Sequence, residues 1–183
     1  MGEREHNRDP ATPWQFPVAL EDVPESGERI ELAADADIRQ AVARTVGLRD
    51  LSRLEANFEV RRQGAGGLHL TGRVSATVGQ TCVVTLEPLV NEIEEDVDLV
   101  FLPRSATGKP SEQADVPANS ADNTEPLIDG QIDLGALATE FLVLGINPYP
   151  RKPGAVFQPP QDATPNQGPF AVLNALKKDR DAR

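Results

Sequence analysis

The chain of 183 residues contains one cysteine and two histidines, and this shortage limits the chemistry it can support. A lone Cys82 excludes an internal disulfide. With only His6 and His69 beside it, the chain also cannot form a zinc site of four cysteines or of two cysteines and two histidines. We therefore expect no metal and no other cofactor. We expect Cys82 to be a small buried structural residue, with a reactive thiol as the alternative.

Aromatic residues and long apolar runs are scarce as well. Six Phe, one Trp and one Tyr leave the core to aliphatic side chains. The longest apolar stretch, residues 141–146, is far shorter than the ~20 residues that span a bilayer, and the polar N-terminus has no apolar segment of the kind that targets secretion. The sequence thus predicts a soluble, cytoplasmic protein that does not enter a membrane, with a length typical of one domain.

No set of residues indicates catalysis. His69 falls among the outward residues of an expected strand, and no helix follows the glycines of residues 64–67 to form a dinucleotide site. Four acidic residues at 92, 94, 96 and 98 are spaced by two along a strand, which gives a row and not a cage for a cation such as Ca²⁺. We interpret them as a solvated acidic face and expect that the protein is not an enzyme.

The net charge of −11 is distributed unevenly along the chain. Residues 87–140 contain 13 acidic side chains against two basic ones, whereas residues 39–73 contain seven arginines against three acidic side chains. The total charge argues against a uniform coating of nucleic acid. Its bipolar distribution predicts two surfaces of opposite sign.

The N-terminal third shows alternating and helical periods in turn. Residues 16–20 and 30–32 alternate as strands do, joined either as a short hairpin or as two strands with a loop between them. Asp35 or Asp37 can cap a helix whose apolar positions are Ile38, Val42 and Val46 and which ends at Gly47.

Three longer strands follow, near residues 54–60, 68–78 and 93–101, with a glycine-rich turn at 63–67 and Pro88 at a turn or bulge. Residues 126–128 predict a short edge strand. Asp133 then caps a second helix that ends before Pro148. The apolar stripe expected on that helix consists of Leu134, Leu137, Phe141 and Leu144.

These patterns predict an α+β fold with a curved, mainly antiparallel sheet, two main helices and a short C-terminal helix, with a partly closed barrel as an alternative for the sheet. We expect residues 1–13 to be a disordered tail and residues 14–150 to be one domain with a mobile loop at 103–126. Residues 151–168 are expected to be a proline-rich linker, and residues 169–183 a helical docking segment.

Three separated blocks carry a resemblance to a known family. The first is residues 80–88, in which Cys82 precedes Thr85, Leu86, Glu87 and Pro88. The second runs from Ile132 to Pro150, and the third starts at Pro169. In this order the blocks resemble the YceD proteins of bacteria and plastids, in the form with one cysteine before Thr-Leu-Glu-Pro. The likeness extends over about residues 14–178.

The resemblance implies a non-enzymatic factor that supports assembly of the large ribosomal subunit and accumulation of its RNA. Family genes tend to neighbour the gene of a small basic protein of that subunit, which would suit an acidic surface. Many family members have a second cysteine close to this motif. Here Val83, Val84 and Thr85 follow Cys82, which places a metal-dependent role in doubt.

Two hypotheses for the partner stay open. In the first, the protein binds preribosomal RNA of the large subunit, a basic ribosomal protein, or both. In the alternative, it is a chaperone or adaptor that binds protein through its acidic face with no direct RNA contact. Trp14, Tyr149 or Phe157 could stack on RNA bases. The RNA-binding candidates are Arg39, Arg44, Arg61, Arg62, Arg73, Lys177 and Lys178. The protein-binding candidates are Glu92, Glu94, Asp96, Asp98, Phe170, Leu173 and Leu176. The sequence does not determine the oligomeric state.

Overall fold

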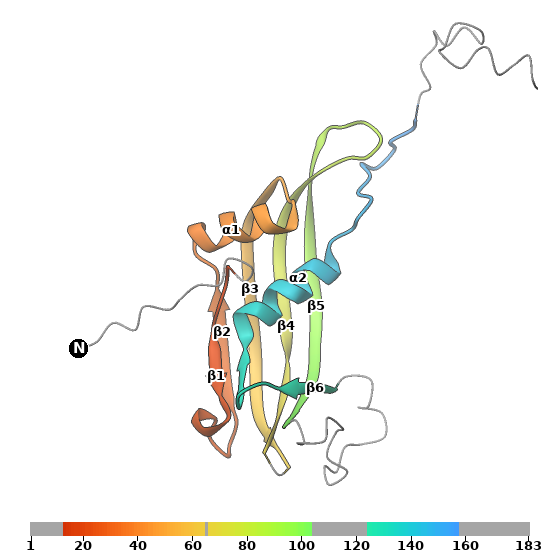
Figure 1. The fold of residues 1–183 in the computed structure, drawn as a ribbon. Coiled ribbons are helices and arrows are strands. Elements are labelled where there is room, and N and C mark those ends of the chain that lie inside the picture. Colours follow the sequence, from red (N-terminus) through yellow and green to blue (C-terminus); the bar gives the residue numbers. More distant parts are fainter. Residues whose placement is uncertain (1–12, 65, 104–123, 158–183) are drawn as a thin grey trace, which may run out of the picture.

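The structure is a computed structural model that describes residues 13–64, 66–103 and 124–157 (Figure 1). Its strands are β1 (Pro17–Ala19), β2 (Glu28–Ala33), β3 (Asp50–Gln63), β4 (Gly67–Thr81), β5 (Pro88–Pro103), β6 (Thr124–Leu127) and β7 (Gln131–Asp133). Its helices are the 3-10 helix η1 (Leu20–Asp22) and the α-helices α1 (Ala36–Val46) and α2 (Leu134–Gly145).

Five strands form the main sheet in the order β2-β3-β4-β5-β6, and β1 pairs with β7 in a separate two-stranded ribbon. All pairs are antiparallel except β5 with β6. The expected α+β class with a mainly antiparallel sheet is confirmed. The sheet is open, with β2 and β6 at opposite edges, so the described residues do not form the barrel that was the alternative.

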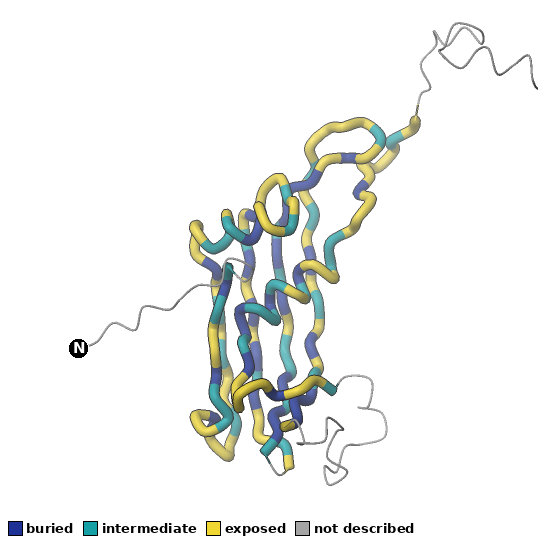
Figure 2. Tube along the Cα trace, viewed as in Figure 1, coloured by how far each residue is buried: buried dark blue, intermediate teal, exposed yellow. Residues whose placement is uncertain are grey.

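One face of the sheet forms the core. Alternate residues of β3, β4 and β5 are buried under the helices, and the strands show this alternation in Figure 2. Both helices and the β1–β7 ribbon pack into one hydrophobic cluster with that face. Gly72 lies opposite Phe58 in the register, and a Cβ there would lie 2.8 Å from the Phe58 ring. Glycine therefore leaves the space that this fully buried ring fills.

The helices begin and end where their capping residues predict. The Asp35 carboxylate accepts a hydrogen bond from the Ile38 N–H at 2.8 Å, and Gly47 ends α1 with φ of 74°. The Asp133 carboxylate accepts from the N–H groups of Gly135 and Ala136, and also from that of Phe16. Asp133 thus caps α2 and fastens the start of β1 beside it.

Several expectations need correction. The hairpin alternative for the first two strands is wrong, because β1 pairs with β7 and β2 pairs with β3. The apolar stripe expected on α2 is wrong at Leu144, which is 69% exposed, whereas Ala138 and Leu142 are buried. Residues 141–144 are all apolar, so the sequence does not show which of them face the core.

Parts of the expected loop, linker and termini lie outside the described residues. Residues 104–123 of the loop are not described, and its ends belong to β5 and β6, so the expectation of a loop is wrong there. The expected C-terminal helix also falls outside. Within the described ranges, no helix is long and apolar enough to cross a membrane.

Candidate functional site

The residues of the first family block form a tight turn at the end of β4. The Cys82 N–H donates to the Glu87 carbonyl at 2.9 Å, and the Leu86 N–H donates to the Cys82 carbonyl at 3.0 Å. Leu86 closes the turn in the left-handed region with φ of 60°, and Pro88 begins β5. The turn at Pro88 is confirmed. Cys82 lies in the turn itself, one residue beyond the end of β4.

The Cys82 thiol is buried inside this turn and held by backbone donors. Its Sγ accepts from the Lys152 N–H at 3.3 Å and from the Thr85 N–H at 3.4 Å. The Lys152 N–H, followed by donors from Thr85, lowers the pKa of the thiol to about 6, because these groups stabilise the thiolate more than burial disfavours it. Cys82 is therefore a structural acceptor that joins two segments 70 residues apart.

The second family block meets the first at this point. The Val83 N–H donates to the Pro150 carbonyl at 3.0 Å, and the Gln80 side-chain amide donates to the Asn147 carbonyl at 2.9 Å. The Gln80 amide oxygen accepts from the Asn91 side chain at 2.7 Å. We call this arrangement of residues 80–91 with residues 147–152 the motif corner. It fixes the chain that leaves α2 against the β4–β5 hairpin.

Sequence reasoning did not identify Gln80, Asn91 or Asn147 as members of the corner. Gln80 is the one buried polar or charged residue among those the structure describes. A signal was present, because Gln80 continues the buried series Val74, Ala76 and Val78 at a period of two. A polar residue at a buried position needs a partner, but the partner 67 residues away could not be read from the sequence.

The surface of the motif corner is held by one ion pair. Lys152 Nζ lies 2.9 Å from Glu87 Oε2, and the Thr85 hydroxyl donates to the same oxygen at 3.2 Å. Lys152, followed by Thr85, lowers the pKa of Glu87. Every polar group named at the corner is engaged with another group of the same chain, and the geometry contains no nucleophile paired with a base.

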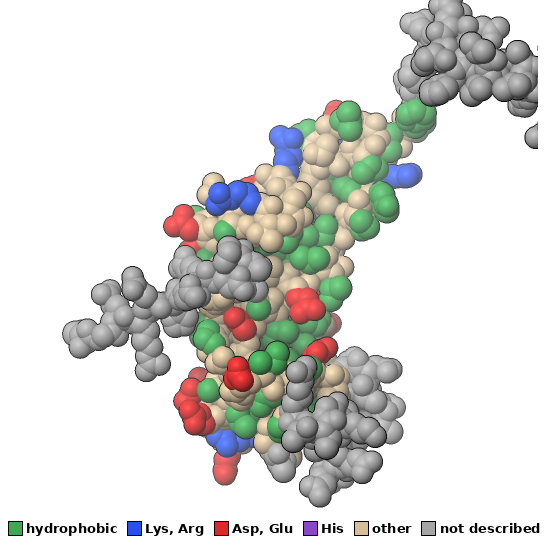
Figure 3. All heavy atoms as spheres, viewed as in Figure 1, with side chains coloured by type: hydrophobic (Ala, Val, Ile, Leu, Met, Phe, Trp, Pro, Cys, Tyr) green, Lys and Arg blue, Asp and Glu red, His purple; other side chains and the backbone are tan. Residues whose placement is uncertain are grey.

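The second candidate region is the face of the sheet opposite the helices. The four predicted acidic residues of β5 all point to this face, as expected from their alternation with Ile93 and Val97. The outward charges of β2 to β5 are eight acidic residues and four arginines. We call this surface the charged face. Figure 3 views the opposite, helix-covered side, where hydrophobic side chains gather over α2 and near the motif corner.

Ion pairs on the charged face join β5 to the inner strands β3 and β4, and others lie within β3. Arg53 lies 2.8 Å from Glu92 and 3.3 Å from Glu55, and the Glu92 hydrogen bond is the main cause that raises the pKa of Arg53. The Thr77 hydroxyl, followed by Arg53, lowers the pKa of Glu92. His69 Nε2 lies 2.8 Å from Asp98 Oδ1. Carboxylates of β5 thus face cationic or polar side chains on β3 and β4.

The arginines predicted to bind RNA do not gather into one patch. Arg73 contacts Asp96 at 2.7 Å and Glu94 at 3.6 Å, and Arg61 pairs with Glu59. The remaining described candidates donate to oxygens of their own chain: Arg39 to Ala34, Arg44 to Gln40, and Arg62 to Glu21 and Val23.

The structure describes the aromatic residues predicted to stack on RNA bases but not the candidates in the C-terminal segment. Trp14 is buried, so it is not available to stack on a base, whereas Tyr149 and Phe157 are exposed. The predicted residues of the C-terminal segment lie outside the described residues: Phe170, Leu173, Leu176, Lys177 and Lys178.

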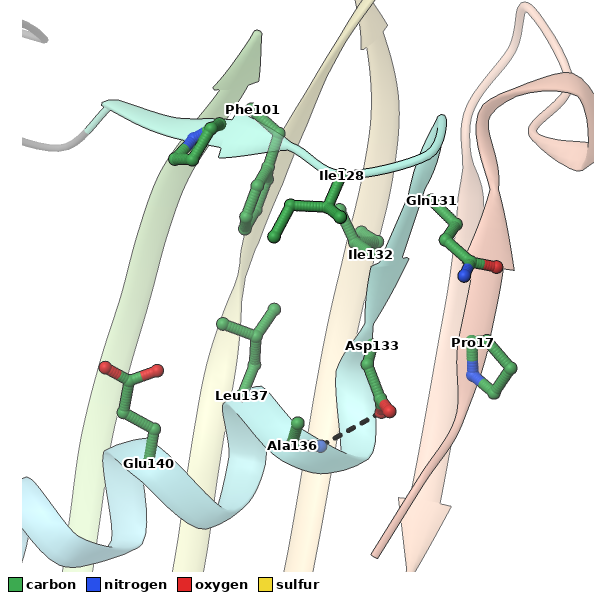
Figure 4. Close-up of a pocket in the computed structure, with 10 residues that line it drawn as sticks. Pro17, Phe101, Ile128, Gln131, Ile132, Asp133, Ala136, Leu137 and Glu140 are labelled. Atoms are coloured by element: carbon green, nitrogen blue, oxygen red, sulfur yellow. Dashed lines mark hydrogen bonds between the residues drawn. The ribbon is translucent and has the colours of Figure 1, made fainter. Parts of the chain in front are cut away.

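An apolar hollow of about 290 Å³ lies between α2 and the β6–β7 connection. Figure 4 shows Phe101, Ile128 and Leu137 directed toward it, with the Asp133 carboxylate turned to the Ala136 N–H. Because Asp133 already caps α2, the hollow offers no free pair of acid and base. Within the described ranges, no group of three or more His, Cys, Asp or Glu side chains is placed to hold a metal ion.

The fold and the site define a class: an open α+β sheet domain whose sequence motif locks two segments together and whose exposed face is acidic. A family profile described as "Large ribosomal RNA subunit accumulation protein YceD" matches residues 70–177. The chain belongs to the YceD family, and the family name indicates a role in accumulation of large-subunit ribosomal RNA. Searches of curated proteins and of solved structures found no match.

Proposed function

We propose that this protein is a non-enzymatic factor in assembly of the large ribosomal subunit. It supports accumulation of the large RNA by binding a basic ribosomal protein on its charged face. Family membership supports the role in RNA accumulation. The distribution of charge on the sheet supports the choice of a basic protein as the direct partner.

One observation carries the choice of partner: three of the four arginines of the charged face are already paired with acidic residues. Arg53, Arg61 and Arg73 each contact a carboxylate on the same face, and the acidic residues still exceed the arginines by eight to four. Phosphate binding relies on clustered cations that are free to replace counterions. An acidic surface instead attracts a cationic protein and disfavours RNA.

Direct RNA binding is the alternative function, favoured by the exposed aromatic side chains of Tyr149 and Phe157. To separate the two, the full chain is tagged and isolated from cells, and one half of the material is treated with ribonuclease. We expect a basic large-subunit protein to stay bound after RNA digestion. Loss of all ribosomal material on digestion would overturn the proposal in favour of RNA.

A charge-reversal pair sharpens the same experiment. Glu94→Lys with Asp96→Lys should abolish retention of the basic protein, because it replaces two exposed carboxylates of the face with cations. The matched control, Asp22→Lys with Glu25→Lys, changes the total charge equally at exposed positions away from the face. Equal loss in both variants would mean that only net charge matters and would refute a specific surface.

A further inference from the structure

The outer edge of β5 has no strand beside it over most of its length. β5 pairs with β4 from Pro88 to Phe101, but on its other side β6 covers only Val100–Pro103. Among the described residues, no strand pairs with residues 92–99 on that side. We call these eight residues the β5 edge. They span about 26 Å at about 3.3 Å per residue, enough for one added strand.

The two faces of the β5 edge differ in chemistry. On the charged face, the side chains of Glu92, Glu94, Asp96 and Asp98 are 62–77% exposed although each contacts a donor on an inner strand. On the opposite face, Ile93 and Val97 are buried. The end of α2 lies directly above, because a Cβ on Gly145 would approach Ile93 Cγ2 to 2.5 Å. Leu144 in the same turn remains exposed.

We infer that the β5 edge accepts an extended segment of the basic partner as an additional strand. This inference rests on the proposed function and specifies how the partner binds. Lysine or arginine at every second position of the segment would lie beside the row of four carboxylates. The intervening apolar side chains would point to the opposite face, beside the last turn of α2.

A second copy of this chain does not suit the edge. Two β5 edges placed side by side would bring four carboxylates of one strand against four of the other, and like charges directly opposite are destabilising. Edge strands commonly use charge to prevent such self-pairing. The same row that repels a copy attracts a cationic strand, so charge selects the partner while the free backbone groups supply the hydrogen bonds.

The test uses the full chain and two capped peptides of identical composition. In the first, four lysines alternate with three valines; in the second, the four lysines precede the three valines. We expect the alternating peptide to bind at least about tenfold more tightly, since only that order matches the period of the strand. Binding should weaken as salt rises. Equal affinity of the two peptides would overturn strand addition.

Amide hydrogen exchange locates the added strand without any substitution. With the alternating peptide bound, amides within residues 92–99 should exchange more slowly. The edge strand β2 on the far side of the sheet serves as the internal control and should be unaffected. Protection of β2 in place of β5, or protection of neither strand, would refute the assignment.

Charge reversal on two strands of the charged face, β5 and β3, completes the test. Glu94→Lys with Asp96→Lys at the edge should lose binding of the alternating peptide. Glu55→Lys with Glu59→Lys, on the same face but on the interior strand β3, should retain most of it. Thermal unfolding checks that both variants fold.

If the tagged chain retains a basic ribosomal protein but β5 is not protected, strand addition is wrong and the proposed function stands. If the peptide protects β5 but no ribosomal protein is retained, the proposed partner is wrong and the edge assignment stands.

Discussion

The motif corner and the β5 edge belong to the same hairpin but differ in how their polar groups are used. At the corner, the Cys82 thiol, the Gln80 amide and the Pro150 carbonyl all bind groups of the same chain. Along the β5 edge, the backbone on one side has no partner among the described residues, and the carboxylates remain largely exposed. The polar groups of the corner are therefore used within the chain, whereas those of the edge are available to a partner.

The residues that identify the family are therefore different from the residues that we propose bind the partner. The residues that carry the resemblance, from Gln80 to Pro88, hold the end of α2 in place. That placement puts Gly145 over Ile93, while in the part of the chain that the structure describes the outer edge of β5 has no neighbouring strand over residues 92–99. A motif can thus identify a family because it builds the scaffold, while the groups that contact a partner lie on an adjacent strand.

The largest expected effect is at the corner, from Gln80→Leu. The substitution keeps the volume but leaves the Asn147 carbonyl and the Asn91 amide without their partner. We expect a loss of about 2–4 kcal/mol in the free energy of unfolding, measured by urea denaturation. Thr81→Ala, at the exposed neighbouring position, is the control and should change it by less than about 0.5 kcal/mol. If both substitutions changed the free energy of unfolding by a similar small amount, the hydrogen bonds of Gln80 would not stabilise the corner as described.

The next effect is a pH dependence that arises from Cys82. Its pKa is about 6 in the folded protein, below the value of about 8.5 for a free thiol. A folded pKa below the unfolded one gives stabilisation that is complete above the unfolded value and is lost as pH falls through the folded value. The free energy of unfolding should therefore rise from about pH 6 to about pH 9.

Cys82→Ala tests that origin, because it removes the titrating group and leaves the rest of the chain unchanged. The variant should lack the rise seen for the wild type when urea denaturation is repeated across the same pH range. An identical rise in the two proteins would assign the dependence to another group. The buried thiol should also react slowly with thiol reagents in the native state, since it has no accessible surface.

A smaller effect is expected from Arg73→Ala on the charged face. Removing this exposed arginine should leave the melting temperature nearly unchanged. It also frees Glu94 and Asp96, so binding of the alternating lysine peptide should strengthen about two- to fivefold. If Arg73 instead contacts RNA, Arg73→Ala should weaken association of the protein with precursor particles. After ribonuclease treatment, the variant and the wild type should then no longer differ. That result would contradict the assignment of the charged face to a basic protein.

The smallest effect is expected from Lys152→Ala. The structural contact of Lys152 is its main-chain N–H to Cys82, which alanine preserves, while its ammonium makes an exposed pair with Glu87. The melting temperature should therefore barely change, and the thiolate absorbance should titrate as in the wild type. Lys152→Pro, which removes the donor, is the contrasting variant and should raise the pKa of the thiol. A raised pKa in the alanine variant would assign the effect to the side chain.

Local patterns were sufficient for most elements because their signals lie within a few residues. Asp35, Gly47 and Asp133 mark helix ends through short-range hydrogen bonds and backbone conformation, and the structure confirms all three. The alternation of β3 to β5 likewise identified which residues face the core. The pairing of β1 was missed, because its partner β7 lies more than 100 residues away.

The sequence by itself determined most elements of this protein, its family, its acidic character and the row of carboxylates on one face of a strand, because each follows from composition, motif or local period. Only the tertiary structure decided that Cys82 and Gln80 lock two distant segments together, that the predicted RNA-binding arginines pair with other groups of the chain, and that β6 leaves most of β5 uncovered. The physical reason is range: these features depend on contacts between residues far apart in the chain, which no local period records.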